Sequence, residues 1–579
     1  MQYSKLEQYF KSRFEELLNK RTPDSYRVRH HNVLSILEEL CELIEGWQKR
    51  RIQSPETVIY CVEECVKLIK EDAWIDYSFY DKKLLLDDMD KYIIIIPESK
   101  DKRESIYEAS SKLKYVCRKC ISCNSSVYAK NLFMYLIGEI NKPGDMDEDG
   151  CYIKEMESFD RALSFLCSEL LRIGHSKNHL YMKAHRLLEG KININNLKDQ
   201  LLAQDNISYE VIYKFQSYLH IDECKNEYGF CDNVDEIKSK LENPQGYIPF
   251  KNFLTPNRST LYKVLNVEAL DTYAAIKKAK NSMALLLDTL HLGNSMKTIK
   301  FDSNVLVLSK ATAGRFYSEL RNHDYQLDGT YKFDPDMSKR LKSYVNDILD
   351  STLVKDDAKD RLKSALRHFR MANDSNDIEL RFVNYWIALE FIFSSPISNE
   401  NTFVRIKKHL VNILCYSYIA RNTRYLDGLL HKDGVLSADK SLIGMTDAEW
   451  GSLIDNITDT NTQYRLCQMK SHLHSKNDIE KYIAIHKQNL EWHITRIYRM
   501  RNELIHEAAL KQDIEGATSN LRFYLVFVLN QLINYFHTVS MPVSINNFFH
   551  DFENKTNIIW ENKDRNYVLN AEYEALLLC

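Results

Sequence analysis

The chain has 579 residues, enough for about three or four domains and for a core that needs no disulfide or metal support. Its 78 Lys and Arg residues nearly balance 81 Asp and Glu residues, and the net charge of -3 excludes a histone-like basic protein and an acidic tail. Only 16 Gly and 10 Pro residues occur, which favours long helices over turn-rich β folds; GxGxxG and GxxxxGK are both absent, which argues against Rossmann and P-loop nucleotide sites.

Residues 1–240 predict a mainly helical N-terminal region, because apolar residues recur there at intervals of three and four. The β-branched run at 92–96, closed by a proline, predicts a strand within it. Residues 141–150 have the composition of a linker and could divide the region in two. Beyond them, residues 163–173 and 180–188 predict two helices.

Residues 241–330 predict a small α/β domain. Short strand patterns occur at 262–267, 298–301 and 305–308. Between the first two, Asp271 is placed to cap a helix whose apolar residues share one face.

Residues 331–560 predict a helical bundle, and residues 561–579 a C-terminal tail. The expected fold is therefore mainly α, with a helical N-terminal region, a small α/β insert and a C-terminal bundle. Capping residues and apolar periodicity predict helices over 357–372, 377–393, 403–418, 485–501 and 520–536.

The first residues alternate charged and apolar side chains and lack the apolar core of a secretion signal. The 13 cysteines show no disulfide-framework spacing, which suits a reducing compartment. Residues 523–549 carry no Lys, Arg, Asp or Glu, but they contain amides that a bilayer would exclude, so they predict a buried helix and a loop. We expect a cytoplasmic protein without a membrane span.

The most informative segment is ITRIYRMRNELIHEAAL, residues 494–510. Asn502 and His506 are four residues apart and share a helix face, whereas Arg501 and His506 are about 140° apart on a straight helix. A site that uses all three side chains therefore requires the helix to bend or end here, or requires a second protomer.

RNELIHE (501–507) resembles the Rx4H signature of the HEPN superfamily, including the polar residue that usually follows the arginine. Upstream, RFVNYWIALEFIFSS (381–395) resembles the second helix of the ApeA-like branch, with Glu390 four residues after Trp386. ALRHFRMAN (365–373) resembles its first helix and residues 520–536 its closing helix. The resemblance covers roughly 335–540 and does not extend to residues 1–330.

The resemblance implies a bundle that forms a homodimer, with two motifs facing each other, and a metal-independent endoribonuclease that needs no cofactor and often serves as a toxin or in antiviral defence. In that chemistry His506 transfers protons, Arg501 stabilises the phosphate in the transition state and Asn502 orients either group. Glu390 is a possible supporting residue. Arg496, Arg499 and Lys487 are expected either to bind neighbouring RNA phosphates or to form an ordinary solvated helix face.

Two other groups of residues suggest metal or core roles. Cys117, Cys120 and Cys123 have a spacing that can hold zinc, although a fourth ligand is missing nearby and three small buried side chains are the simpler interpretation. His175, His179 and His185 lie around a helix junction, where capping or core roles are favoured. HExxH and GxSxG are absent, so neither a zincin nor a serine hydrolase is indicated.

Two functions from different classes follow. The first is a HEPN-type endoribonuclease that acts on RNA, with an unknown trigger bound by residues 1–330. The alternative is a catalytically silent HEPN-like bundle that serves as a dimerisation or RNA-binding scaffold. The intact set of Arg501, Asn502 and His506 favours the enzyme, because a scaffold does not require it.

Overall fold

The structure is a computed structural model, and part of the chain lies outside its description. It describes residues 5–19, 31–52, 54–96, 103–142, 151–203, 206–216, 228–239, 253–255, 260–293, 300–309, 316–321, 335–375, 377–395, 400–507 and 514–573.

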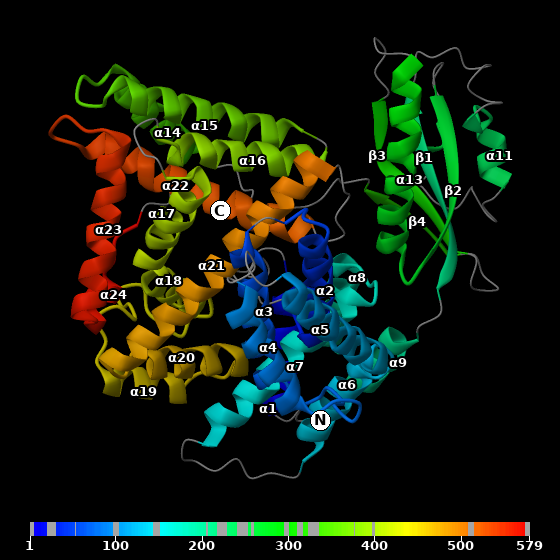
Figure 1. The fold of residues 1–579 in the computed structure, drawn as a ribbon, viewed down its shortest axis with the longest axis horizontal. Coiled ribbons are helices and arrows are strands. Elements are labelled where there is room, and N and C mark those ends of the chain that lie inside the picture. Colours follow the sequence, from blue (N-terminus) through cyan, green and yellow to red (C-terminus); the bar gives the residue numbers. More distant parts are fainter. Residues whose placement is uncertain are drawn as a thin grey trace. The chain divides into compact units, whose positions relative to one another are not determined.

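The chain divides into two compact units (Figure 1). The first unit joins Met1–Ser168 to Leu327–Cys579, and the second comprises Glu169–Gln326. The fold is mainly helical with one small sheet, which confirms the predicted fold class.

The N-terminal part of the first unit is helical, as predicted. Asn32 caps the second helix: its side chain accepts from the Ser35 amide, and the Ser35 hydroxyl accepts from the Asn32 amide. The helices are α1 (Lys5–Leu18), α2 (Val33–Gln48), α3 (Pro55–Glu71), α4 (Lys82–Ile95), α5 (Arg103–Asn124), α6 (Tyr128–Asn141) and α7 (Cys151–Arg172).

The prediction of a strand at 92–96 is wrong, because residues 92–95 form the last turn of α4 and Ile96 is its C-cap. Leu85, Met89 and Tyr92 are fully or almost fully buried and lie at helical spacing, so packing of this face overrides the weak strand preference of consecutive isoleucines. The predicted linker lies mostly outside the described residues, since 143–150 are not described.

The C-terminal part of the first unit contains all five predicted helices, several of them longer than expected. The predicted tail contains one more short helix, α24. The helices are α14 (Pro335–Asp350), α15 (Asp356–Asp374), α16 (Ile378–Phe393), α17 (Thr402–Tyr416), α18 (Tyr418–Lys432), α19 (Asp447–Asp455), α20 (Thr460–His472), α21 (Lys476–Glu507), α22 (Ile514–Thr538), α23 (Ile545–Asn562) and α24 (Arg565–Leu569).

Residues 523–536 belong to α22, in which Asn530 and Gln531 are buried together with the apolar side chains. This confirms the prediction of a buried helix. Over the described part of the chain, no helix combines the length and the apolar composition needed to cross a bilayer.

N-terminal and C-terminal helices pack together within the first unit, although the sequence predicted separate regions. The buried Glu16 of α1 accepts hydrogen bonds from Asn461 (2.7 Å) and Arg13 (3.1 Å), and Arg465 lies 2.9 Å from its other oxygen. Since Asn461 and Arg465 belong to α20, this network joins the N-terminal and C-terminal parts of the first unit.

The second unit contains a four-stranded antiparallel sheet in the order β2-β1-β3-β4, with α13 against one face (Figure 1). Val211 and Tyr213 of β1 face α13, while Ile212 packs in the core on the opposite face. The elements are α8 (Lys177–Leu188), α9 (Ile194–Leu202), β1 (Ile207–Gln216), α11 (Val234–Ser239), β2 (Thr260–Ala269), α13 (Thr272–Gly293), β3 (Lys300–Ser309) and β4 (Phe316–Arg321).

This unit begins before the predicted boundary at residue 241, because β1 lies within the region expected to be helical. Two short strands were expected at 298–301 and 305–308; residues 298–299 lie outside the described ranges, and residues 300–301 and 305–308 belong to the single strand β3. Asp271 accepts from the amide of Ala274 at 2.9 Å, which confirms that it caps α13.

Candidate functional site

The RNxxxH motif lies in the last two turns of α21, which remains helical through Glu507. The helix does not end before His506, so positions 501 and 506 of one chain lie on different faces, about 140° apart. The side chain of His506 lies outside the described part of the structure. The described half of the motif is therefore Arg501 and Asn502.

Arg501 is held by two neighbours. Its Nη2 lies 3.3 Å from Glu390 Oε1 in α16, and its Nη1 donates to the Asn502 side chain at 3.1 Å. Glu390 Oε1 also accepts a 2.7 Å hydrogen bond from the indole N–H of Trp386. The structure thus brings together Arg501, Asn502 and Glu390, and it places Glu390 where it can orient the arginine.

An aromatic cluster packs next to the Glu390–Arg501 ion pair. The buried ring of Trp386 packs against Tyr498 of α21 at 5.7 Å, and Tyr498 stacks on Phe403 of α17 at 4.0 Å. Three helices, α16, α17 and α21, therefore meet at this cluster beside the Glu390–Arg501 ion pair. Because aromatic packing restricts the side chains involved, it limits the positions that Glu390 and Arg501 can take.

Arg496 and Arg499 do not form an exposed basic face. Arg496 Nε donates to both oxygens of Glu39 in α2 (2.9 and 3.0 Å), and its Nη2 donates to Glu64 in α3 at 2.5 Å. Arg499 Nη2 donates to Glu39 at 2.6 Å. Both arginines are engaged in the interior of the unit, so the structure corrects the expectation that they are solvated or free to bind phosphates.

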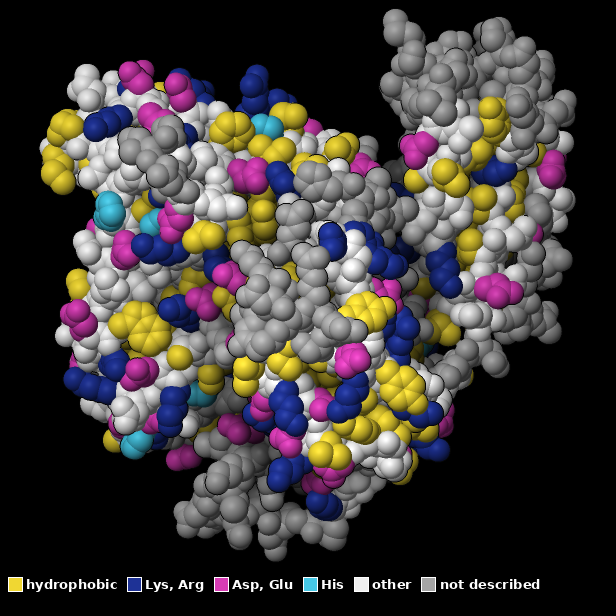
Figure 2. All heavy atoms as spheres, in the orientation of Figure 1, with side chains coloured by type: hydrophobic (Ala, Val, Ile, Leu, Met, Phe, Trp, Pro, Cys, Tyr) yellow, Lys and Arg dark blue, Asp and Glu magenta, His cyan; other side chains and the backbone are white. Residues whose placement is uncertain are grey.

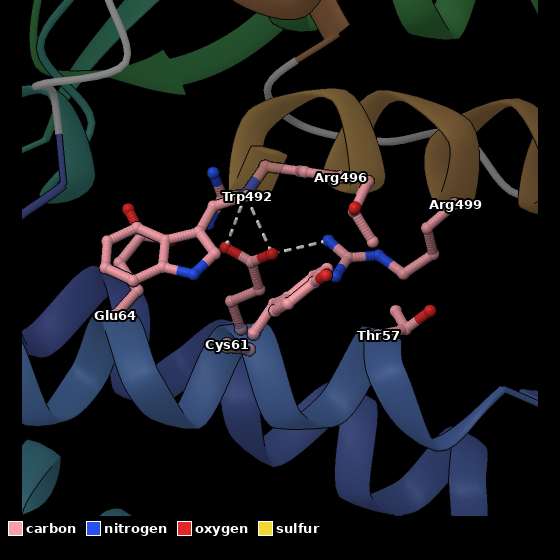
Figure 3. A pocket seen from close by; sticks show the side chains of 9 residues that line it. Thr57, Cys61, Glu64, Trp492, Arg496 and Arg499 are labelled. Carbon is pink, nitrogen blue, oxygen red and sulfur yellow. Dashed lines mark hydrogen bonds and ion pairs between the residues drawn. The ribbon is translucent and has the colours of Figure 1, made fainter. Parts of the chain in front are cut away.

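A small pocket lies at this ion-pair cluster, between α21 and the N-terminal helices, with room for roughly one water molecule (Figure 3). Figure 3 shows Arg496, Arg499 and Trp492 of α21 facing Thr57, Cys61 and Glu64 of α3. Although burial alone would raise the pKa of Glu39, Arg496 and Arg499 hold it well below its usual value. The carboxylate is therefore charged at neutral pH.

Lys487 lies apart both from Arg501 and from the ion-pair cluster around Glu39. It is exposed on α21, with its ammonium 5.9 Å from the centre of the Trp560 ring in α23. Arg501 follows it by 14 positions along the same helix, which corresponds to about 20 Å. The structure does not bring it close to Arg501.

The alternative metal-binding residues occupy core or junction positions. Cys117 and Cys120 are fully buried in α5, and Cys123 is partly buried. In the second unit, His175 Nε2 donates to the Leu201 carbonyl oxygen at 2.9 Å and the His175 ring stacks on His179, while His185 lies 3.5 Å from Glu189. In the described ranges, no group of His, Cys, Asp or Glu side chains is arranged to hold a metal ion.

The residues that sequence reasoning missed are Glu39, Glu64 and Glu503. Glu39 follows Ile36 by three positions and precedes Leu43 by four, so it lies within the apolar stripe of α2. A carboxylate in a buried stripe requires a cationic partner. The position of Glu39 in this stripe was visible in the sequence, but the sequence did not identify Arg496 and Arg499 as its partners.

Comparisons with protein-family models, with curated proteins and with solved structures found no match to this chain.

Proposed function

We propose that this protein is a metal-independent endoribonuclease of HEPN type, in which Arg501, Asn502 and His506 form the catalytic site. The observation that carries the proposal is the arrangement of Arg501. Its guanidinium is about one-fifth exposed and is oriented by Glu390 and Asn502, so it is fixed in direction yet accessible from solvent. A fixed guanidinium fork suits a phosphate that gains charge in the transition state.

The reaction we propose uses the RNA as its own nucleophile. The 2′-hydroxyl attacks the adjacent phosphorus and loses its proton to an imidazole, and the 5′ oxygen leaves with a proton donated by an imidazolium. The products are a 2′,3′-cyclic phosphate and a 5′-hydroxyl. His506 supplies the imidazole, since histidine exchanges protons near neutral pH. DNA lacks the 2′-hydroxyl and is not cut.

A homodimer completes the proposed site. Because Arg501 and position 506 lie on different faces of α21, the second protomer has to bring the two groups together. An apolar stripe beside Glu390 on α16 is exposed at its two ends and supports this arrangement, since apolar side chains left at a surface mark protein contacts. It consists of Leu380 (57% exposed), the partly buried Val383 and Ile387, and Phe391 (38% exposed), and Figure 2 shows hydrophobic side chains at the surface around α15 and α16.

RNA cleavage by matched variants tests the proposal. Mixed RNA is incubated with the wild type, Arg501→Ala and His506→Ala, with and without EDTA, beside a DNA strand of the same sequence. We expect only the wild type to cut RNA, to leave cyclic phosphate ends and to tolerate EDTA, and each variant to lose about a hundredfold or more in rate. An inert wild type, loss of cutting with EDTA, or variants as active as the wild type would contradict it.

A silent scaffold remains the second candidate, and one observation favours it. Glu390 and Asn502 already occupy part of the hydrogen-bonding capacity of Arg501, as they would in a purely structural ion pair. Overexpression in a host cell separates the two functions: a nuclease is toxic and His506→Ala relieves the toxicity, which also tests the toxin or antiviral role. A scaffold is equally harmless with either residue.

A further inference from the structure

A ladder of ion pairs connects the N-terminal helices to the motif turn of α21. Arg496 contacts Glu64 and Glu39, and Arg499 also contacts Glu39. Arg499 Nε then lies 3.7 Å from Glu503, four residues along α21. The ladder therefore begins on α3 and α2 and ends at the residue that follows Asn502.

The ladder and the Glu390 contact hold α21 from opposite sides. On an ideal helix, Arg496, Arg499 and Glu503 lie within about 60° of one another, whereas Arg501 lies roughly 160° away from the middle of that group. Position 506 follows Glu503 by three residues, so Glu503 lies one turn before it on the same side. The ladder thus reaches the part of the motif that Glu390 does not contact.

Glu39 is the central residue of the ladder, because both arginines bind it. Its side chain is 12% exposed and those of Arg496 and Arg499 are 10% and 14% exposed. Arg496 Nη1 is buried at this cluster and has no hydrogen-bond partner within the described structure. No spare hydrogen-bond acceptor is therefore available to these arginines in place of Glu39. Loss of the Glu39 carboxylate would leave two largely buried cations poorly paired.

We propose that Glu39 is a positioning residue for the RNxxxH site, so that helix α2 of the N-terminal region sets the placement of the motif turn. This inference rests on the proposed function for its catalytic consequence. Glu39 acts through Arg499 and Glu503 and does not touch RNA. A displacement of α2 moves or loosens the turn that carries Asn502 and His506, which gives the N-terminal helices a physical route to the site.

The experiment combines amide hydrogen exchange with RNA cleavage in the full chain. Glu39→Gln keeps the size of the side chain and removes its charge. Glu16→Gln is the matched control, because Glu16 is also buried and also binds two arginines, yet it joins α1 to α20. We expect Glu39→Gln to speed exchange of amides 503–507 by about tenfold or more and to lower kcat with little change in KM. Glu16→Gln should change neither.

Several outcomes would overturn the inference. It fails if exchange of 503–507 in Glu39→Gln equals that of the wild type, or if Glu16→Gln loosens the same amides equally. If Glu39→Gln does not fold, Arg499→Gln is used instead, since it breaks the same ladder and leaves the Arg496–Glu39 contact. Exchange of amides 503–507 that equals the wild type in Arg499→Gln would also overturn the inference. A wild type that does not cut RNA refutes the proposed function, while the exchange data still decide whether α2 holds the motif turn.

Discussion

Arg501 Nη2 of α21 lies 3.3 Å from Glu390 Oε1 of α16, and the same oxygen accepts the Trp386 indole N–H at 2.7 Å. One carboxylate thus ties the motif arginine to a buried tryptophan. Because the ion pair is partly exposed, its contribution to folding is small, whereas its effect on the direction of the guanidinium is direct.

Replacing Glu390 should therefore reduce catalysis more than stability. Glu390→Gln can still accept the Trp386 hydrogen bond but no longer attracts Arg501 by charge, so we expect RNA cleavage to fall about ten- to a hundredfold with the melting temperature nearly unchanged. Single-turnover kinetics and thermal melting measure the two effects. Glu379→Gln on the same helix is the control, and an equal loss of activity in both variants would argue against a specific role for Glu390.

The apolar stripe on α16 should control the oligomeric state. Leu380→Asp places a charge within this apolar surface, and we expect a dimer to become a monomer in light scattering, with a change in unfolding free energy of no more than about 0.5 kcal/mol. Leu285→Asp serves as control, since Leu285 is 71% exposed on α13 of the second unit. A wild type that is monomeric, or a Leu380→Asp variant that stays dimeric, would exclude this surface as the dimer contact.

We expect Arg496 to contribute to the stability of the fold. Its charge should contribute almost nothing to RNA binding. Arg496→Ala leaves Glu39 and Glu64 without their shared partner, and breaking a buried ion pair in this way destabilises a protein by about 3–5 kcal/mol. Tryptophan fluorescence during urea unfolding measures it, because all 6 tryptophans lie in the first unit. Arg367→Ala, at an exposed position of α15, should change stability little; an equally small effect of Arg496→Ala would contradict the buried cluster.

The second unit should lose stability in mild acid. Burial lowers the pKa of His179 to about 4, whereas an unfolded chain has a histidine pKa near 6.5. As the pH falls from 7 to 5, the unfolded state takes up a proton that the folded state excludes, so stability decreases by about 2 kcal/mol. Hydrogen exchange of amides in β1 should report this decrease, and His179→Gln should reduce it. The same pH dependence in that variant would show that His179 is not its source.

Asp271 should be a second residue on which the stability of the second unit depends. Its side chain accepts from Ser176 (2.9 Å to the amide and 2.7 Å to the hydroxyl) and from the Ala274 amide. Burial raises the pKa of Asp271, but hydrogen bonds and the neighbouring histidines outweigh it and lower the pKa to about 2. We expect Asp271→Asn to weaken the sheet of this unit by about 1–3 kcal/mol, measured by hydrogen exchange in β1, with the fluorescence midpoint of the first unit unchanged. A shift of that midpoint alone would contradict the assignment.

Local periodicity was sufficient to predict most helices of the C-terminal part. Helix α16 begins after its capping Asp377 and ends at Phe393, as expected from the sequence, because capping and apolar spacing depend on neighbours within a turn or two. The run at 92–96 shows the limit of that reasoning. Its β-branched residues favour a strand, yet the face formed with Leu85 and Met89 is buried only when the segment is helical.

The sequence alone also determined the spacing of Arg501, Asn502 and His506, and thereby the chemistry that these residue types allow. Only the tertiary structure decided that Glu39 neutralises Arg496 and that Glu390 orients Arg501. Glu39 and Arg496 are 457 positions apart, and no periodicity or spacing rule reaches that far. Charged side chains take the partners that folding brings near them when water is removed, so their roles depend on the packing of distant helices.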